Sequence, residues 1–160
     1  MFKIEKLQCC DYESFRNMFL YYFTKECGVE YDIDKLRENL VDGYILKSFE
    51  RGETFIDVAK KQDKVVGFII YQINSKERGD EERLGSGYIA EFYVDSEYRR
   101  FGLGSLLLQN AEKTMKALGV NDVYLTSVDQ EGVKIFYEKN GYINTHQIAD
   151  NDQEIFEKSL

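Results

Sequence analysis

Hydrophobic and polar positions follow two periods along this chain, one typical of helices and one typical of strands. Apolar residues recur with helical spacing in four segments. Helices are therefore predicted over residues 12–24, 34–49, 104–118 and 130–140. Asp11 and Asp34 are the expected caps of the first two, because an aspartate before a helix can accept the free N–H groups of its first turn. The expected apolar face of the third helix consists of Leu103, Leu106, Leu107, Ala111, Met115 and Leu118.

Shorter apolar runs predict β-strands over residues 2–7, 55–60, 65–73, 88–94, 123–127, 142–145 and 154–158. The alternating run at 2–7 is typical of an edge strand. The runs at 55–60 and 65–73 flank a short polar turn and predict an antiparallel hairpin. Two helices before a hairpin, with strand-helix-strand-helix-strand units after it, indicate an α/β or α+β protein with a mixed sheet. A charged, solvated loop is expected over residues 75–86.

Composition narrows the class of protein. The 160 residues are expected to form a single domain, residues 1–160, and the formal charge of -8 disfavours nucleic acid as a partner. No apolar run approaches the about 20 residues that span a membrane, and no signal peptide is visible. Cys9, Cys10 and Cys27 form no CxxC pair, and His146 is the only histidine. We therefore expect no metal site, and reduced thiols in a cytoplasmic protein.

The start of the third helix has unusual chemistry for such an acidic chain. Arg99 and Arg100 precede it, Gly102 and Gly104 open it, and no acid occurs before Glu112. A helix N-terminus carries free N–H groups and favours negative charge, and glycines let a ligand approach the backbone closely. The pattern predicts an external anion here, such as a phosphate or pyrophosphate. A glycine turn with solvated arginines is the alternative.

Two motifs carry a resemblance to a known family. Arg99-x-x-Gly102-x-Gly104 resembles the [QR]-x-x-G-x-[GA] motif of the GNAT superfamily of acyl-CoA-dependent N-acyltransferases. Ile135-Phe136-Tyr137-Glu138-Lys139-Asn140-Gly141-Tyr142 resembles the F-Y-E-K-x-G-[FY] signature of that family, which follows in the expected order. The resemblance implies the GNAT-like fold, a central, mostly antiparallel sheet of six to seven strands flanked by about four helices.

The resemblance also implies an activity and its residues. An acetyl group would pass from acetyl-CoA, bound as co-substrate without a metal, to a primary amine by direct attack through a tetrahedral intermediate. Tyr137 matches the position that protonates the departing thiolate. Glu91 is the candidate base, directly or through water, because it is the only acid between Glu82 and Asp95 and lies on a strand. The cofactor-binding residues expected from the motifs are Phe92, Tyr93, Val94, Arg99, Arg100, Phe101, Gly102, Leu103, Gly104, Ser105, Gln130 and Lys139.

The acceptor is less constrained by the sequence. The charge of -8 and the acidic loop at residues 75–86 favour a small cationic amine. Two alternatives remain open: an acetyltransferase acting on protein or peptide amines, and a non-catalytic acyl-CoA-binding regulatory domain on the same fold. Members of this family are often dimeric, so a homodimer is a further alternative.

Overall fold

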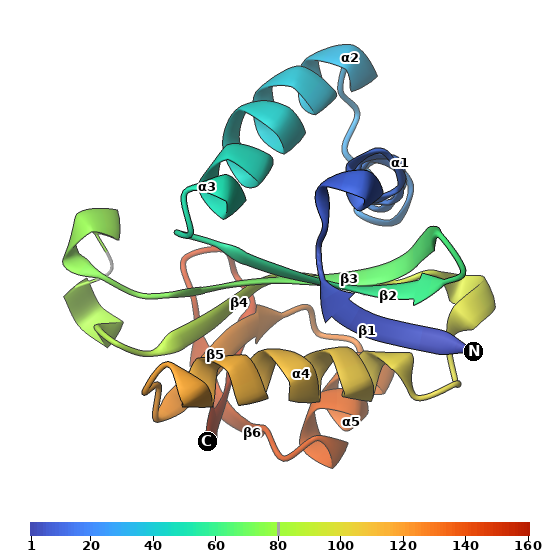
Figure 1. Cartoon of the computed structure of the whole chain (residues 1–160). Coiled ribbons are helices and arrows are strands. Elements are labelled where there is room, and N and C mark those ends of the chain that lie inside the picture. Colours follow the sequence, from blue (N-terminus) through green and yellow to red (C-terminus); the bar gives the residue numbers. More distant parts are fainter. Residues whose placement is uncertain (80) are drawn as a thin grey trace. The chain divides into compact units, whose positions relative to one another are not determined.

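A seven-stranded, mostly antiparallel sheet organises the chain, with the strand order β1-β2-β3-β4-β5-β7-β6 (Figure 1). The computed structural model describes residues 1–79 and 81–160, without the side chain of Glu81. Asp80 and the Glu81 side chain, part of the predicted charged loop, therefore lie outside the described residues. The strands are β1 (Phe2–Lys6), β2 (Phe55–Lys61), β3 (Lys64–Ile73), β4 (Gly87–Val94), β5 (Asp122–Ser127), β6 (Ile143–Ile148) and β7 (Glu154–Ser159).

Four helical rods accompany the sheet, so the predicted α/β class and helix number are confirmed. The helices are α1 (Tyr12–Tyr21), α2 (Ile33–Leu36), α3 (Lys47–Glu50), α4 (Leu103–Ala117) and α5 (Glu131–Lys139). The first rod continues beyond α1 into a π-helical segment, η2 (Tyr22–Glu26), and a second π-helical segment, η3 (Arg37–Leu46), joins α2 to α3. Gly43 suits η3, because a Cβ there would lie 2.8 Å from the Glu38 carbonyl oxygen.

Of the two predicted helix caps, Asp34 is wrong, and Asp11 takes the N-cap position of α1 without the expected hydrogen bond. Asp32, not Asp34, caps the second rod: its Oδ1 accepts the N–H groups of Asp34 at 3.0 Å and Lys35 at 3.1 Å. The Asp11 side chain makes no capping bond to α1. It is buried instead, with Oδ1 2.6 Å from the Lys60 Nζ. A buried carboxylate requires a partner of opposite charge, and this requirement takes precedence over capping.

The chain divides into two compact units, residues 1–70 with 91–110, and residues 71–90 with 111–160. In the first unit, α1 and the α2–α3 rod cover one face of the strands, and α4 lies against the opposite face (Figure 1). Its core combines apolar side chains of α1, η3, β2 and β3 that are at most 1% exposed. They include Phe15, Phe19, Val41, Ile56, Val58 and Phe68. This core fixes α1 against the sheet and so positions the residues that follow α1.

In the second unit, β5 has a parallel neighbour on one side, β4, and an antiparallel neighbour on the other, β7. Gly87–Ile89 of β4 pairs in parallel with Val123–Leu125 of β5, and β5 pairs antiparallel with β7 along its whole length. Glycine is required at position 87, at the start of β4, unless Met115 moves, because a Cβ there would collide with the Met115 sulfur. This close approach packs α4 tightly onto the strands.

The predicted apolar face of α4 is partly wrong. Leu103, Leu107, Ala111 and Met115 are buried as expected, and Leu108 is buried beside them. Leu106 is 49% exposed, and Leu118, which lies beyond the end of the helix, is 54% exposed.

Candidate functional site

The turn between β4 and α4 leaves the N-terminus of the helix open and free of acids. Arg100 and Gly102 have positive φ angles of 67° and 77°. The Gly102 carbonyl accepts the Leu106 N–H at 3.0 Å, so α4 begins directly after this glycine. A Cβ built on Gly102 meets no atom within 4 Å, and the first turn contains no acidic residue. The first-turn N–H groups have no partner inside the helix, so the arrangement suits an anion.

The two arginines before α4 differ in their surroundings. The Arg99 side chain has partners within the protein. Its Nε donates to the Val94 carbonyl at 2.9 Å, and its Nη2 is 3.6 Å from Glu26. Its guanidinium also lies 5.5 Å from the centre of the Tyr93 ring. Arg100 is exposed and forms no ion pair within the described chain. Arg99 therefore holds the end of β4, and Arg100 has its charge available at the helix start.

Phe101, between these arginines and Gly102, is 64% exposed and packs its ring 5.9 Å from that of Phe2. This contact ties the turn to the edge strand β1.

Glu91 lies on β4 with a half-buried carboxyl group. The Tyr22 hydroxyl donates a hydrogen bond of 2.6 Å to Glu91 Oε2. Burial raises the pKa of the Glu91 carboxyl above its ordinary value, and the hydrogen bond from Tyr22 opposes that rise. The carboxylate is therefore a stronger proton acceptor than an ordinary glutamate, and it has a fixed hydrogen-bond donor.

Three further groups surround this pair in the first unit. The Tyr93 hydroxyl donates to Glu26 Oε1 at 3.3 Å, and burial, followed by the charge of Glu26, raises the pKa of Tyr93 to about 12. The Cys27 thiol lies beside Tyr22, and burial is the main cause of its raised pKa. The sequence analysis assigned no catalytic or cofactor-binding role to Tyr22, Glu26 or Cys27. No motif marks them, because η2 meets β4 only after folding.

In the second unit, Tyr137 lies on the inner face of α5. Its side chain is 8% exposed, and its ring lies 5.7 Å from that of Tyr142 and 5.8 Å from that of Phe156. Burial raises the pKa of Tyr137 well above that of an ordinary phenol. Within the described chain the hydroxyl has no hydrogen-bond partner, yet it is not among the fully buried unpaired atoms. The ring is therefore packed among aromatic neighbours on the inner face of α5.

The remaining predicted residues of α5 are exposed. Gln130 is the N-cap of α5 without a side-chain capping bond, and Lys139 lies in its last turn. Neither side chain forms a hydrogen bond or ion pair with the residues that the structure describes, so both are available to a ligand.

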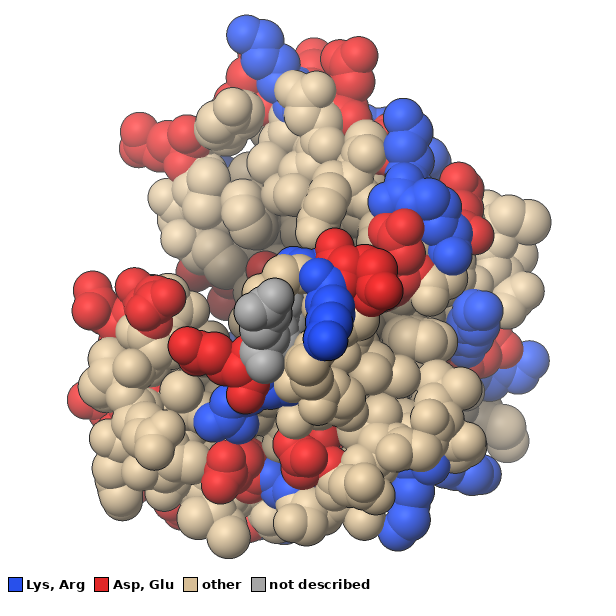
Figure 2. Space-filling model, turned by 90° about the vertical axis from the view of Figure 1, so that its left-hand side faces the viewer, with Lys and Arg blue, Asp and Glu red and all other residues tan. Residues whose placement is uncertain are grey.

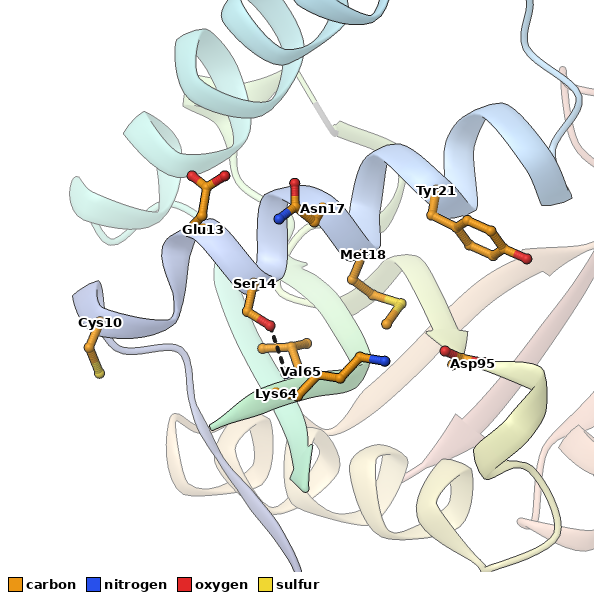
Figure 3. Close-up of a pocket in the computed structure, with 9 residues that line it drawn as sticks. All are labelled: Cys10, Glu13, Ser14, Asn17, Met18, Tyr21, Lys64, Val65 and Asp95. Atoms are coloured by element: carbon orange, nitrogen blue, oxygen red, sulfur yellow. Dashed lines mark hydrogen bonds between the residues drawn. The ribbon is translucent and has the colours of Figure 1, made fainter. Parts of the chain in front are cut away.

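A pocket of about 590 Å³ opens between α1 and the start of β3. Ser14 and Met18 from α1 and Lys64 from β3 point into it, and the Ser14 hydroxyl accepts the Val65 N–H at 2.8 Å (Figure 3). Asp95 lines it from the end of β4. The sequence analysis did not predict this pocket, because its walls come from segments far apart in the chain.

The surface charge, possible metal ligands and helix hydropathy can be examined on the folded chain. Figure 2 shows acidic side chains in several separate groups with basic ones between them, so that face carries no single charged patch. Among the residues that the structure describes, no cluster of three or more His, Cys, Asp or Glu could hold a metal ion. No helix in residues 1–79 and 81–160 is long and apolar enough to cross a membrane.

Comparison with known proteins decides the family. Residues 12–142 match the family described as acetyltransferase (GNAT) family. The chain belongs to the GNAT family. Its relative N-alpha-acetyltransferase 30 from Schizosaccharomyces pombe is 35% identical over 89 residues, which are 55% of this chain and 57% of that protein. The chain thus matches little more than half the length of this relative.

Solved GNAT structures have the same fold. The PaiA N-acetyltransferase from Thermoplasma acidophilum, solved with coenzyme A, has a TM-score of 0.75 at 24% identity and covers 100% of this chain and 99% of its own. The yncA protein from Salmonella typhimurium, solved with acetyl-CoA, has a TM-score of 0.76 at 14% identity over 100% and 94% of the two chains. These likenesses confirm the predicted GNAT fold.

Proposed function

We propose that this GNAT protein is an acetyl-CoA-dependent N-acetyltransferase that acts on a primary amine. The observation that carries the proposal is the open, acid-free start of α4, with Gly102 at a φ of 77° and Arg100 unpaired in the described chain. Coenzyme A carries phosphate groups, which fit N–H groups at a helix start. Solved relatives of the same fold contain coenzyme A or acetyl-CoA.

The residues present fit this co-substrate. The N–H groups of Leu103, Gly104 and Ser105 and the Arg100 guanidinium would hold its phosphates, and the backbone of Phe92–Val94 would align its pantetheine arm. Gln130 and Lys139 are exposed and would make polar contacts. When bound, acetyl-CoA supplies the activated acetyl thioester.

Glu91 is the proposed base. An amine with an ordinary pKa near 10 is protonated at neutral pH and must lose a proton before it can attack. The half-buried Glu91 carboxylate has a pKa raised by burial, which makes it a better proton acceptor, and Tyr22 holds it in place. Glu91 would take the proton directly or through one water molecule.

Tyr137 is the proposed proton donor to the leaving thiolate. The phenol is protonated at working pH, and its hydroxyl makes no hydrogen bond to the described residues. These two properties are what a donor requires, since a hydroxyl already bonded to the protein would have to break that bond first.

Two acceptor classes remain, each with its own support. The charge of -8 and the carboxylates of Glu26 and Glu91 in the first unit favour a small cationic amine. The identity to a protein named N-alpha-acetyltransferase 30 favours the α-amino group of a polypeptide.

The three free cysteines suit a reducing compartment such as the cytoplasm.

Transfer of radiolabelled acetyl groups to a panel of polyamines, aminoglycosides, lysine peptides and peptides with free N-termini tests the proposal. We expect transfer to at least one class, and a loss of about 10²-fold or more in kcat/KM for Glu91→Gln. Glu50→Gln is the matched control, because Glu50 is exposed and its Oε1 accepts from Tyr12 at 3.3 Å.

Acetyl-CoA binding without transfer to any acceptor would favour the non-catalytic alternative. An active Glu91→Gln would assign the proton transfer to water.

A further inference from the structure

Tyr22 occupies a position where the backbone and three aromatic rings fix its side chain. It begins η2, and the bond from the Cys27 N–H to the Tyr22 carbonyl, 3.0 Å long, closes the wide π-type turn. Its ring centre lies 5.0 Å from that of Tyr93, 5.6 Å from that of Phe68 and 6.1 Å from that of Phe19. Because the ring cannot turn freely among these neighbours, its hydroxyl has one direction, toward β4.

That hydroxyl reaches the carboxylate of Glu91, 69 residues further along the chain, at 2.6 Å. Burial, followed by the negative charge of Glu91, raises the pKa of Tyr22 far above that of an ordinary phenol. Tyr22 therefore stays protonated wherever the enzyme would work, and it donates this bond permanently. A donor to a carboxylate stabilises the ionised form and lowers its pKa.

The other polar groups near Tyr22 and Glu91 supply no cation to the Glu91 carboxylate within the described residues. The Cys27 thiol adjoins the phenol from the end of η2, and Tyr93 packs on Tyr22 from β4 with its hydroxyl on Glu26. The cation of Arg99 lies near Glu26 and Tyr93. Within residues 1–79 and 81–160, Glu91 itself forms no ion pair. Tyr22 is thus the group that offsets the cost of burying this carboxylate.

We propose that Tyr22 is a positioning residue for Glu91. Its hydroxyl holds the Glu91 carboxylate in the basic form and directs the other carboxylate oxygen, Oε1, at the amine acceptor. This inference rests on the proposed function of Glu91 as the base. On this reading, the π-helical segment η2 after α1 brings the Tyr22 phenol to Glu91, in the middle of strand β4.

Tyr22→Phe tests the inference, because it removes one oxygen and keeps the ring in its aromatic cluster. Tyr12→Phe is the matched control: Tyr12 is on the same rod and donates to a glutamate, Glu50, at an exposed site. The first measurement is a carbon-13 NMR titration of glutamate carboxyl groups, with the Glu91 signal identified by its loss in Glu91→Gln. We expect the Glu91 midpoint to rise by about 1 to 2 pH units in Tyr22→Phe and to stay unchanged in Tyr12→Phe.

The second measurement is the pH dependence of kcat/KM for acetyl transfer. Since Glu91 must be ionised to act, the acidic limb should move to higher pH in Tyr22→Phe by the same amount as the NMR midpoint. An unshifted Glu91 titration, or a shifted titration with an unshifted rate profile, would overturn the inference. A shifted titration in a protein that transfers no acetyl group would refute the proposed function and uphold the contact between Tyr22 and Glu91.

Discussion

The substitution Gly102→Asp should separate the stability of α4 from its affinity for phosphate. Gly102 has a φ of 77°, where a residue with a Cβ costs about 1 kcal/mol, and its surroundings are open to 4 Å. A carboxylate beside an acid-free first turn regains about 0.3 to 1 kcal/mol from the helix dipole. The two terms nearly cancel, so we expect the Tm of the ligand-free variant to lie within a few degrees of wild type.

Binding should change far more than stability. Two like charges about 4 Å apart repel by about 1 kcal/mol in water and about 4 kcal/mol at an effective dielectric constant near 20. The expected loss of acetyl-CoA affinity is therefore about 5-fold to 1,000-fold. At a ligand concentration of about 100 Kd, binding stabilises the wild type by about 2.7 kcal/mol, or about 5 to 11 °C in Tm for a chain of this size. A 100-fold loss would leave about 1 °C of that shift.

The assay is the Tm with and without acetyl-CoA, with Kd measured by calorimetry. Gly102→Asn is the matched control, because it has the same shape and the same backbone cost without the charge. We expect it to keep most of the ligand-induced shift. Equal shifts in wild type, Gly102→Asp and Gly102→Asn would show that phosphate does not lie at the start of α4.

Two further predictions concern Tyr137 and Cys27. Tyr137→Phe should lower kcat by about 10-fold to 1,000-fold with unchanged acetyl-CoA affinity. The control Tyr142→Phe loses a buried hydrogen bond of 3.0 Å to Glu112, so it should lower the Tm and spare turnover. A fully active Tyr137→Phe would remove Tyr137 from the mechanism. Cys27, whose pKa is raised mainly by burial and also by the charge of Glu91, should react with iodoacetamide at pH 8 more slowly than free glutathione, and faster in Glu91→Gln. Peptide mapping by mass spectrometry follows that rate, and equal rates in both proteins would contradict the electrostatic contact.

Local patterns predicted most of the elements. The helix from Leu103 and the strand ending at Val94 lie within a residue or two of their predicted bounds, because periodicity and glycine positions act over short distances. The acid-free first turn of α4 could be predicted in the same way, because it is a property of consecutive residues.

Predictions failed where contacts between distant segments decide the surroundings of a side chain. Asp11 could cap α1 by its position, but it pairs with Lys60 of β2 instead. Leu106 fits the apolar stripe of α4, yet it is half exposed, because the packing around a helix decides which part of a broad stripe is covered. Neither outcome can be read from neighbouring residues.

The sequence by itself determined the family, the sheet with its four helical rods and the glycine-rich, acid-free start of α4, since each depends on short segments with characteristic spacing. Only the tertiary structure decided what surrounds Glu91. Tyr22 reaches it from the far end of α1 through a π-helical turn, and its hydrogen bond and the burial of the site together set the pKa of the carboxylate. Burial and contacts between distant residues are properties of the packed chain, because the dielectric environment of a group depends on every segment folded against it.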